Sequence, residues 1–411
     1  MAFSIAGMSL RRYRAVLRTP QVPRLVSAAV LGRLPIGMAG LALVLLVRHA
    51  DGSYGLAGLA AGSFSLGAGV AAPLMGRIVD RHGQTPVLLA CAVLCAAAFS
   101  GLALVAASGP SALLPALSAT AGATLPPISA CMRALWSSLV GRGSALQTAF
   151  ALEAAFQELI FITGPLLVVA LIALASPVAA VLAIAATVLV GTCLFAAMPA
   201  SRSWRPPGRR GDWAGALRGA GVRTLLGVIG LLAVSFGMIE VSVPAVAEHL
   251  GSSALSGLFL SLWGGGSMLG GLIVGALTTA RPPERRVVIR LGAVAVGVAP
   301  LAVAMAAVPS FAACMVLAGL GIAPAVACLY LLVDRSAPVG TVTEAFTWMT
   351  SAFTAGSATG SALGGSLVQH AGPGTAFLLA LGAVAMAALL ARVGRPSLAA
   401  PRAPAMEPEA A

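Results

Sequence analysis

The 411-residue chain contains no lysine and few charged residues of any kind. Only 9% of its residues are charged, whereas 59% are hydrophobic. Soluble domains carry roughly 25% charged residues. A soluble fold of this length has too few charges to cover so much apolar surface. The composition therefore excludes an ordinary soluble domain and predicts a protein surrounded mostly by lipid.

Several kinds of chemistry are missing as well. Without lysine, the chain cannot form the glycine-rich phosphate loop of ATPases, which needs that residue. Its serines lie among alanine and glycine, with no histidine at a helical spacing that would activate them. No CxxC occurs, and the six cysteines lie in apolar runs without histidine or carboxylate partners. We expect no enzyme activity, no metal site and no cofactor.

What is present in excess is positive charge, with a formal net charge of +13 carried by arginine alone. The arginines form short clusters between apolar runs, a pattern that favours loops at an anionic membrane surface over a nucleic-acid groove. Arginine without lysine, together with abundant Ala, Gly and Val, is typical of a GC-rich bacterial genome. We expect a bacterial inner-membrane protein with no nucleic-acid partner.

Long apolar runs are frequent, and a membrane helix needs about 20 such residues. The sequence predicts an all-α protein with twelve spans, in which Pro126–Pro127 kinks the fourth. We expect a first bundle over 1–199, a basic linker over 200–224, a second bundle over 225–393 and a disordered tail over 394–411. The spans are 25–47, 55–75, 86–107, 111–134, 146–172, 177–198, 225–246, 254–275, 287–307, 310–333, 343–366 and 372–393.

The distribution of arginine predicts the orientation. With the N-terminus in the cytoplasm, all 25 arginines except Arg33 and Arg48 lie at or near cytoplasmic helix ends, as the positive-inside rule requires. Both termini are then cytoplasmic. The N-terminal segment lacks the apolar region and cleavage site of a signal peptide, so we expect the first span to remain as an anchor.

The two halves of the chain are related in sequence. Gly37–Met38 recurs at Gly237–Met238, Ala130–Cys131 at Ala327–Cys328, and Gly164 at Gly360. The offset drifts in order from 200 through 197 to 196. An ordered drift through three predicted helices indicates a parallel duplication of a six-helix unit.

The most distinctive stretch is "GRIVDRHGQ", Gly76–Gln84, a charged turn between the second and third predicted spans. Gly76, Asp80, Arg81 and Gly83 match the signature Gly-x-x-x-Asp-Arg-x-Gly of the major facilitator superfamily, although Gln84 and Thr85 replace the usual basic pair. With its twelve spans and six-plus-six repeat, the chain resembles that family over about residues 20–393. The resemblance implies two pseudo-symmetric six-helix bundles.

The resemblance also implies a role for the turn. Asp80 would lie against the positive N-terminal end of the helix beginning near Thr343 and would latch the cytoplasmic side in one state of a transport cycle. A merely solvated loop is the alternative. Gly164–Pro165 resembles the end of the glycine-spaced signature on the fifth helix of exporters, and Pro165 is expected to bend that helix.

Charged residues inside spans are costly and usually functional. Arg33 lies about 14 Å into the first span at 1.5 Å per residue. Glu153 and Glu158 lie on the fifth span, about 140° apart around its axis, with Gln157 on the face of Glu153. We expect Glu158 to carry the coupled proton and Arg33 to be its partner. A static Arg–Glu pair that locks the first and fifth helices is the alternative.

Five further polar residues remain to be interpreted. Glu240 on the seventh span is either a second cavity carboxylate or an outer-end residue that reaches the headgroups. Tyr330 supplies a phenol on the tenth span. Arg133 is expected to anchor a loop at the cytoplasmic end of the fourth span, and Asp334 and Glu344 to be solvated or paired with loop arginines.

These features together predict a secondary transporter that works by alternating access. The expected substrate is a small apolar or amphipathic molecule, because the helices that face the cavity in the family carry few hydrogen-bonding side chains here. We expect proton-coupled efflux, driven by the proton gradient, by a monomer in the lipid bilayer. An importer or proton symporter of the same fold is the alternative, and a membrane-embedded enzyme or receptor is a remote one.

Overall fold

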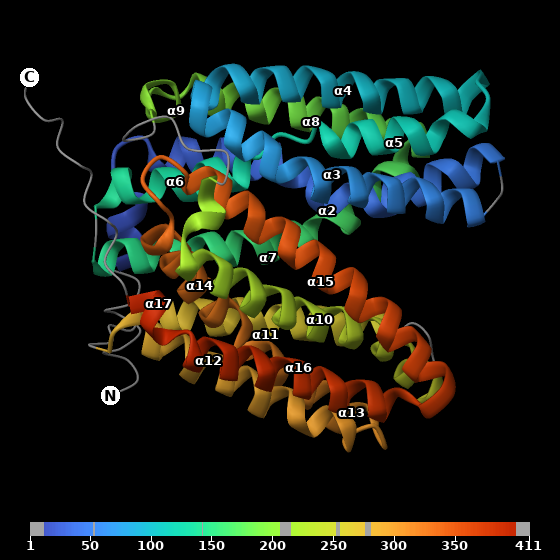
Figure 1. The fold of residues 1–411 in the computed structure, drawn as a ribbon. Coiled ribbons are helices and arrows are strands. Elements are labelled where there is room, and N and C mark those ends of the chain that lie inside the picture. The colour runs from blue at the N-terminus through green and yellow to red at the C-terminus, as the bar shows by residue number, and fades with distance from the viewer. Residues whose placement is uncertain are drawn as a thin grey trace, which may run out of the picture. The chain divides into compact units, whose positions relative to one another are not determined.

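The computed structural model describes residues 12–51, 54–141, 143–205, 215–251, 255–275 and 281–399, and these are almost entirely helical (Figure 1). Helices suit apolar runs in lipid, because each satisfies its own backbone hydrogen bonds. The first half contains α2 (Val22–Asp51), α3 (Tyr54–His82), α4 (Gln84–Ser108), η1 (Ser111–Leu113), α5 (Leu114–Ala123), α6 (Ile128–Val140), α7 (Ser144–Leu174), α8 (Pro177–Ala197) and α9 (Pro199–Ser203).

The second half repeats this helical pattern. Its elements are η2 (Gly215–Arg218), α10 (Ala220–His249), α11 (Leu255–Gly275), α12 (Pro283–Val298), η3 (Ala299–Ala302), α13 (Val308–Leu320), α14 (Ile322–Ser336), α15 (Val342–Ala371), α16 (Pro373–Val393) and α17 (Arg395–Ala399).

Internal contacts divide the chain into two compact units. The first collects the described residues of Met1–Met75, Gln84–Trp204 and Ser267–Leu277, and the second those of Gly76–Gly83, Arg205–Gly266 and Thr278–Ala411. The division between halves falls inside the expected linker, at Trp204 and Arg205. Residues 206–214 of that linker lie outside the described residues, so its boundaries stay a prediction.

Within the described residues, nine helices are long and apolar enough to cross a membrane. They correspond to nine of the twelve predicted runs. The run at 111–134 is divided among η1, α5 and α6, and the run at 287–307 between α12 and η3. The run at 343–366 lies in α15, which is rich in Gly, Ser and Thr. The fold is an all-α membrane protein, whereas the count of twelve spans stays a prediction.

Proline and glycine divide two of the predicted spans. The kink expected at Pro126–Pro127 is a complete break, since residues 124–127 between α5 and α6 are not helical. Neither proline has an N–H group to continue the helical hydrogen bonds. In the second unit Gly321 separates α13 from α14, three residues before Pro324, which is the repeat counterpart of Pro127.

The repeat is visible in how glycines let helices approach one another. A Cβ atom at Gly164 on α7 would lie 2.8 Å from Gly37 Cα on α2, and one at Gly360 on α15 would lie 2.8 Å from Val234 Cα on α10. Gly237, the counterpart of Gly37, packs against the backbone of α15. The same crossing therefore occurs in both units and depends on glycine at related positions.

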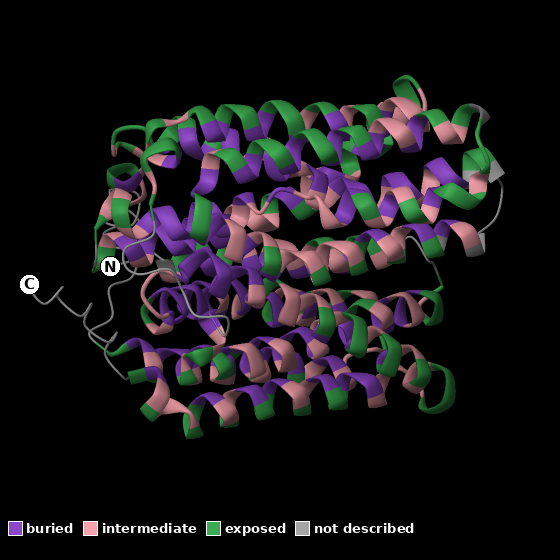
Figure 2. Ribbon diagram, turned by 45° about the horizontal axis from the view of Figure 1, so that its top comes forward, coloured by how far each residue is buried: buried purple, intermediate pink, exposed green. Residues whose placement is uncertain are grey.

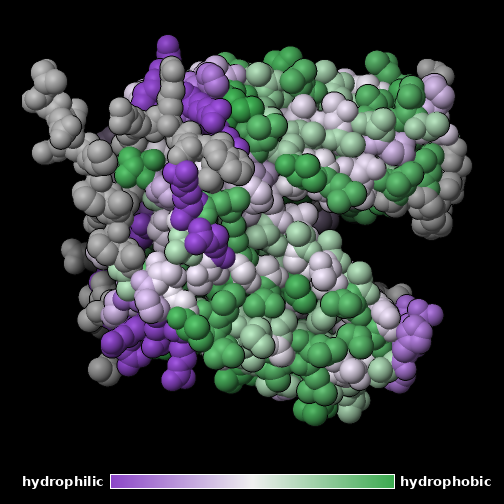
Figure 3. All heavy atoms as spheres, viewed as in Figure 1, coloured by the Kyte–Doolittle hydropathy of each residue, from purple (hydrophilic) through white to green (hydrophobic). Residues whose placement is uncertain are grey.

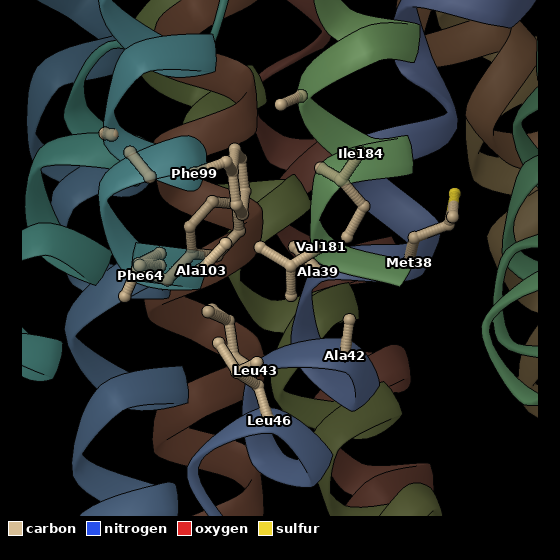
Figure 4. Packing of buried hydrophobic residues seen from close by; sticks show 14 of the residues in the cluster. Met38, Ala39, Ala42, Leu43, Leu46, Phe64, Phe99, Ala103, Val181 and Ile184 are labelled. Atoms are coloured by element: carbon tan, nitrogen blue, oxygen red, sulfur yellow. The ribbon is translucent and has the colours of Figure 1, made fainter. Parts of the chain in front are cut away.

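Large apolar side chains fill the interior of the first unit and also cover much of its surface. Figure 4 shows Met38, Leu43, Phe64, Phe99 and Ile184, which come from α2, α3, α4 and α8 and pack together. Buried and exposed positions alternate around the same helices (Figure 2). Apolar residues cover much of the helical surface seen in Figure 3, while hydrophilic ones gather at helix ends. Such apolar surface suits a lipid environment.

The expected disordered tail is wrong at its beginning. Residues 395–399 form α17, in which Leu398 is buried, and Ser397 Oγ lies 3.0 Å from Thr224 Oγ1 on α10. The apolar side chain of Leu398 and the hydroxyl of Ser397 thus hold this segment against the second unit. Residues 400–411 lie outside the described residues.

The two glycine crossings should be equally intolerant of a methyl group. Gly164→Ala and Gly360→Ala each place that group against backbone, and overpacking of this kind costs about 1–3 kcal/mol. We expect both variants to melt at lower temperature in detergent. Gly40→Ala and Gly382→Ala are matched controls, because a Cβ there meets nothing within 4 Å. The duplicated crossing is contradicted if the first pair melts like the controls.

Candidate functional site

The charged turn at the end of α3 has two glycines with steric roles. Gly83 adopts φ +88°, a left-handed conformation that favours glycine, and its N–H bonds Val79 O at 2.8 Å to close the helix. Gly76 lies directly against α15, where a Cβ would overlap the hydroxyl of Thr347 and lie 3.0 Å from Glu344 Cα. The glycines of the signature therefore end α3 and let it contact α15.

Asp80 caps a helix that is distant in sequence. Its Oδ2 accepts a hydrogen bond from Glu344 N at 2.7 Å and its Oδ1 one from Thr343 N at 3.3 Å, both in the first turn of α15. The N-cap residue of α15, Thr341, gives that helix no side-chain cap. Asp80 therefore satisfies amide groups at the positive end of the α15 dipole.

A second polar contact reinforces this cap. Arg77 Nη2 donates to Glu344 Oε1 at 2.7 Å, and Trp348 Nε1 donates to the same oxygen at 3.4 Å. Glu344 is only 2% exposed, so its expected pairing with a nearby arginine is found and its expected solvation is not. Arg81, the third signature residue, is exposed.

The turn is not a solvated loop, because its carboxylate is bonded to another helix. Asp80 is 7% exposed and is bonded to the helix that the resemblance indicated. A buried carboxylate held by two amides is stable only while those donors stay in place, since an unpartnered buried charge is costly. Movement of α15 away from α3 would therefore require Asp80 to exchange these donors for water.

A second polar group is buried within the first unit. Arg33 on α2 donates through Nη1 to Glu153 Oε1 on α7, and through Nε to Ala29 O at 3.1 Å. Trp136 Nε1 on α6 donates to Glu153 Oε2 at 3.3 Å, and Arg133 Nε lies 3.8 Å from Glu153 Oε1. Glu153 is fully buried and is the common partner of three side chains on two other helices.

The expected pairing of Arg33 with Glu158 is wrong. Arg33 lies eleven residues into α2 and Glu153 nine residues into α7, about 17 and 14 Å along their helices, whereas Glu158 lies about 21 Å along α7. Glu158 also points about 140° away from Glu153 around the helix. The two carboxyl groups lie at similar depths relative to Arg33, and direction therefore selects Glu153. Arg133, expected to anchor a loop, is instead buried beside this carboxylate.

Glu158 has a different kind of partner. Its Oε1 accepts a hydrogen bond from Ser267 Oγ at 2.9 Å, a residue on α11 that groups with the first unit. Ser267 is 1% exposed, while Glu158 is half-buried. Within the described residues, no cation lies within ion-pair distance of Glu158. Its carboxyl group can therefore gain or lose a proton without breaking an ion pair.

The other predicted residues lie apart from these groups. Tyr330 on α14 is buried, with its ring 6.2 Å from that of Phe346 at a T-shaped angle. Gln157 is half-buried on α7, and Glu240 is exposed on α10. Pro165 lies inside α7, which continues through it from Ser144 to Leu174.

Three side chains of these contacts had no functional expectation in the sequence. Trp136 and Ser267 lie in apolar runs where nothing marks them as polar partners, and Glu344 was expected only to be solvated or paired with a loop arginine. The one available signal was the surplus of buried charge over obvious partners on the fifth span, since buried polar groups need hydrogen bonds. The identity of the partners depends on the packing of helices that are distant in sequence.

Comparison with known families identifies the fold. The sequence model of the Major Facilitator Superfamily matches residues 25–347 and, separately, residues 225–410. The chain belongs to the Major Facilitator Superfamily. It is therefore a multi-pass membrane transporter and not an enzyme, and the turn at Gly76–Gly83 is a form of that family's signature.

Solved structures of the same fold cover nearly the whole chain. The human organic anion transporter MFSD10 (TETRAN) is 19% identical over 90% of this chain and 99% of its own, with a TM-score of 0.72. A bacterial homologue of the iron transporter ferroportin, in an outward-facing state, is 18% identical over 92% and 98%, with a TM-score of 0.68. The E. coli fucose:proton symporter FucP is 13% identical over 92% and 99%, with a TM-score of 0.71. At such identities the likeness shows the fold alone.

No sequence among the curated proteins matches this superfamily member. What it transports must therefore be inferred from its own residues.

The buried group around Glu153 predicts unequal effects of removing its members. Glu153→Gln leaves Arg33 and Arg133 buried beside a neutral amide, and breaking a buried pair in this way costs about 3–5 kcal/mol. Arg33→Met leaves Glu153 near Arg133 and should cost less. We expect the melting temperature of the purified protein to fall more for Glu153→Gln. Glu284→Gln, which alters a less buried charge, is the control. A larger fall for Arg33→Met would contradict the shared role of Glu153.

Proposed function

We propose that this transporter exports a small apolar or amphipathic molecule in exchange for protons. The observation that carries the proposal is the environment of Glu158, a carboxyl group within a membrane-spanning helix whose described partner is a neutral hydroxyl. A carboxyl group in such a place favours the protonated form, because a bare charge in a medium of low dielectric constant is costly. Glu158 is therefore suited to carry a proton through the transport cycle.

The contrast with Glu153 supports this assignment. Both residues lie on α7, but Glu153 is fixed by Arg33 and Trp136 and would leave a buried cation behind if it were protonated. Glu153 thus fits the static helix-locking role, with Arg33 as its partner, and Glu158 the mobile proton.

The apolar character of the substrate follows from the composition of the long helices. Between residues 25 and 47, α2 carries Ser27 and Arg33 in an otherwise apolar sequence. Between residues 225 and 247, α10 carries Ser235, Glu240 and Ser242. A sugar carrier needs many hydrogen-bonding side chains at its binding site, because hydroxyl groups left unpartnered on burial are costly. These helices favour a substrate with few hydrogen-bonding groups.

The charged turn supports alternating access. The cap that Asp80 provides for α15 and the Arg77–Glu344 pair are polar contacts that water can replace, so they can form in one state and open in another. We propose that this latch closes the cytoplasmic side. The proposed setting is the bacterial inner membrane, with twelve spans, both termini in the cytoplasm and a monomeric transporter.

A compound panel tests the proposal in cells. Overexpression should raise tolerance to some lipophilic inhibitors, because exported compounds reach lower concentrations inside. Increased sensitivity, or accumulation of the compound in overexpressing cells, would instead indicate an importer or proton symporter of the same fold.

The proton role of Glu158 gives a sharper test. Glu158→Gln imitates the protonated acid permanently, so it should abolish export driven by an imposed pH gradient in liposomes while retaining substrate exchange without a gradient. Glu248→Gln, at an exposed position of α10, is the matched control and should behave like the unaltered protein. Full pH-driven export by Glu158→Gln would remove this residue from the coupling mechanism.

Removing the charge of the latch should affect switching and not folding. Asp80→Asn keeps the shape of the side chain but weakens its bonds to the amides of α15, since bonds to a charged acceptor are about twice as strong as neutral ones. We expect a severalfold lower transport rate in proteoliposomes with normal expression and binding. Glu284→Gln should leave the rate unchanged. An Asp80→Asn variant with the original rate would leave the turn as a structural feature only.

A further inference from the structure

Three aromatic rings meet within the second unit. Phe236 on α10 lies 5.1 Å from Trp263 on α11 and 5.7 Å from Phe353 on α15, measured between ring centroids, with interplanar angles of 75° and 82°. Both contacts are edge-to-face, so the two outer rings do not stack on Phe236. One ring from each of three different helices thus forms a single aromatic group.

This group is not completed by the protein itself. Trp263 is 8% exposed, and its Nε1 has no hydrogen-bond partner within the described residues. A buried indole N–H normally finds an acceptor. Phe236 is only half-buried, so the aromatic group is open at one of its members. A buried unsatisfied donor beside a partly open aromatic group is the arrangement of a site that another molecule completes.

A carboxylate lies next to the aromatic group along α10. Glu240 follows Phe236 by four residues, so the two side chains share a face of the helix one turn apart. Phe236 turns that face toward α11 and α15, which argues against a headgroup-facing position for Glu240. Glu240 is exposed, and within the described residues it has no hydrogen-bond or ion-pair partner.

We propose that Phe236, Trp263, Phe353 and Glu240 form a binding site for a lipophilic aromatic cation that carries a hydrogen-bond acceptor for Trp263 Nε1. The inference rests on the proposed transport function and names the substrate class. Aromatic faces attract a cation through the ring quadrupole, and most strongly where water is excluded. Glu240 supplies the opposite charge within a membrane-spanning helix, where an unpaired carboxylate is otherwise costly. An anion of the same size would be repelled by Glu240 and would gain nothing from the rings.

Two probes of nearly equal size and opposite charge test the site. Binding of labelled tetraphenylphosphonium and, in separate samples, of labelled tetraphenylborate to the purified protein is measured by equilibrium dialysis in detergent at neutral pH. We expect saturable binding of the cation and no saturable binding of tetraphenylborate. Equal or tighter binding of tetraphenylborate would overturn the proposal.

Variants then assign the binding to these residues. Glu240→Gln should weaken cation binding at least about tenfold, because it removes the charge that lies beside the rings. Glu248→Gln, about two turns further along the same helix, should stay within about twofold, because it lies farther from the rings. Phe236→Leu and Trp263→Leu should each weaken binding about tenfold, while Trp263→Phe restores most of it because a ring remains. Equal binding by Trp263→Leu and Trp263→Phe would show that ring faces have no role.

The outcome for the site can be separated from the outcome for the proposed function. Melting temperatures of all variants establish that the protein is folded, and binding in detergent needs no gradient. Export of neutral compounds in the panel, together with no tetraphenylphosphonium binding, would reject the cation site and keep the efflux proposal. Cation binding that is unaffected by Glu240→Gln would place the cation elsewhere and reject this site.

Discussion

The cost of a charge in a lipid environment governs the polar residues of this protein. With only 9% charged residues, nearly every ionisable side chain in a span needs a partner or a reason to be there. Glu153 is held by Arg33 and Trp136, Glu158 by the hydroxyl of Ser267, and Glu240 by nothing in the described residues. Three carboxyl groups in spans thus have three different environments. We assign them three roles on that basis: structural lock, proton carrier and cation site.

The charged turn follows the same rule near the end of a helix. Asp80 is tolerated at 7% exposure because it bonds two amides at the beginning of α15, and Glu344 because Arg77 and Trp348 reach it. Glycine at positions 76 and 83 makes this possible, one by allowing close helix contact and the other by its left-handed conformation. The spacing of the signature is thus a consequence of one helix capping another.

Much of the fold could be predicted from the sequence, because apolar runs indicate membrane helices and repeated glycines indicate related positions in the two halves. The Gly164 and Gly360 counterparts do occupy equivalent crossings, and Asp80 does meet the helix that was expected. The partner of Arg33 could not be predicted in this way. It depends on how α7 is rotated about its axis relative to α2, which sets Glu153 and not Glu158 opposite the guanidinium. Ser267 and Trp136 were missed because a lone hydroxyl or indole in an apolar run carries no pattern. Burial of Leu398 in α17 was missed because a single leucine among prolines and alanines carries no pattern either.

The central claim is that Glu158 holds a proton that leaves during the transport cycle. Infrared difference spectroscopy of the reconstituted protein measures this directly, because a protonated carboxylic acid has its own C=O stretching band. Raising the pH, or adding an exported compound, should reduce a band that is absent in Glu158→Gln and present in Glu248→Gln. A spectrum of Glu158→Gln identical to that of the unaltered protein would contradict the account.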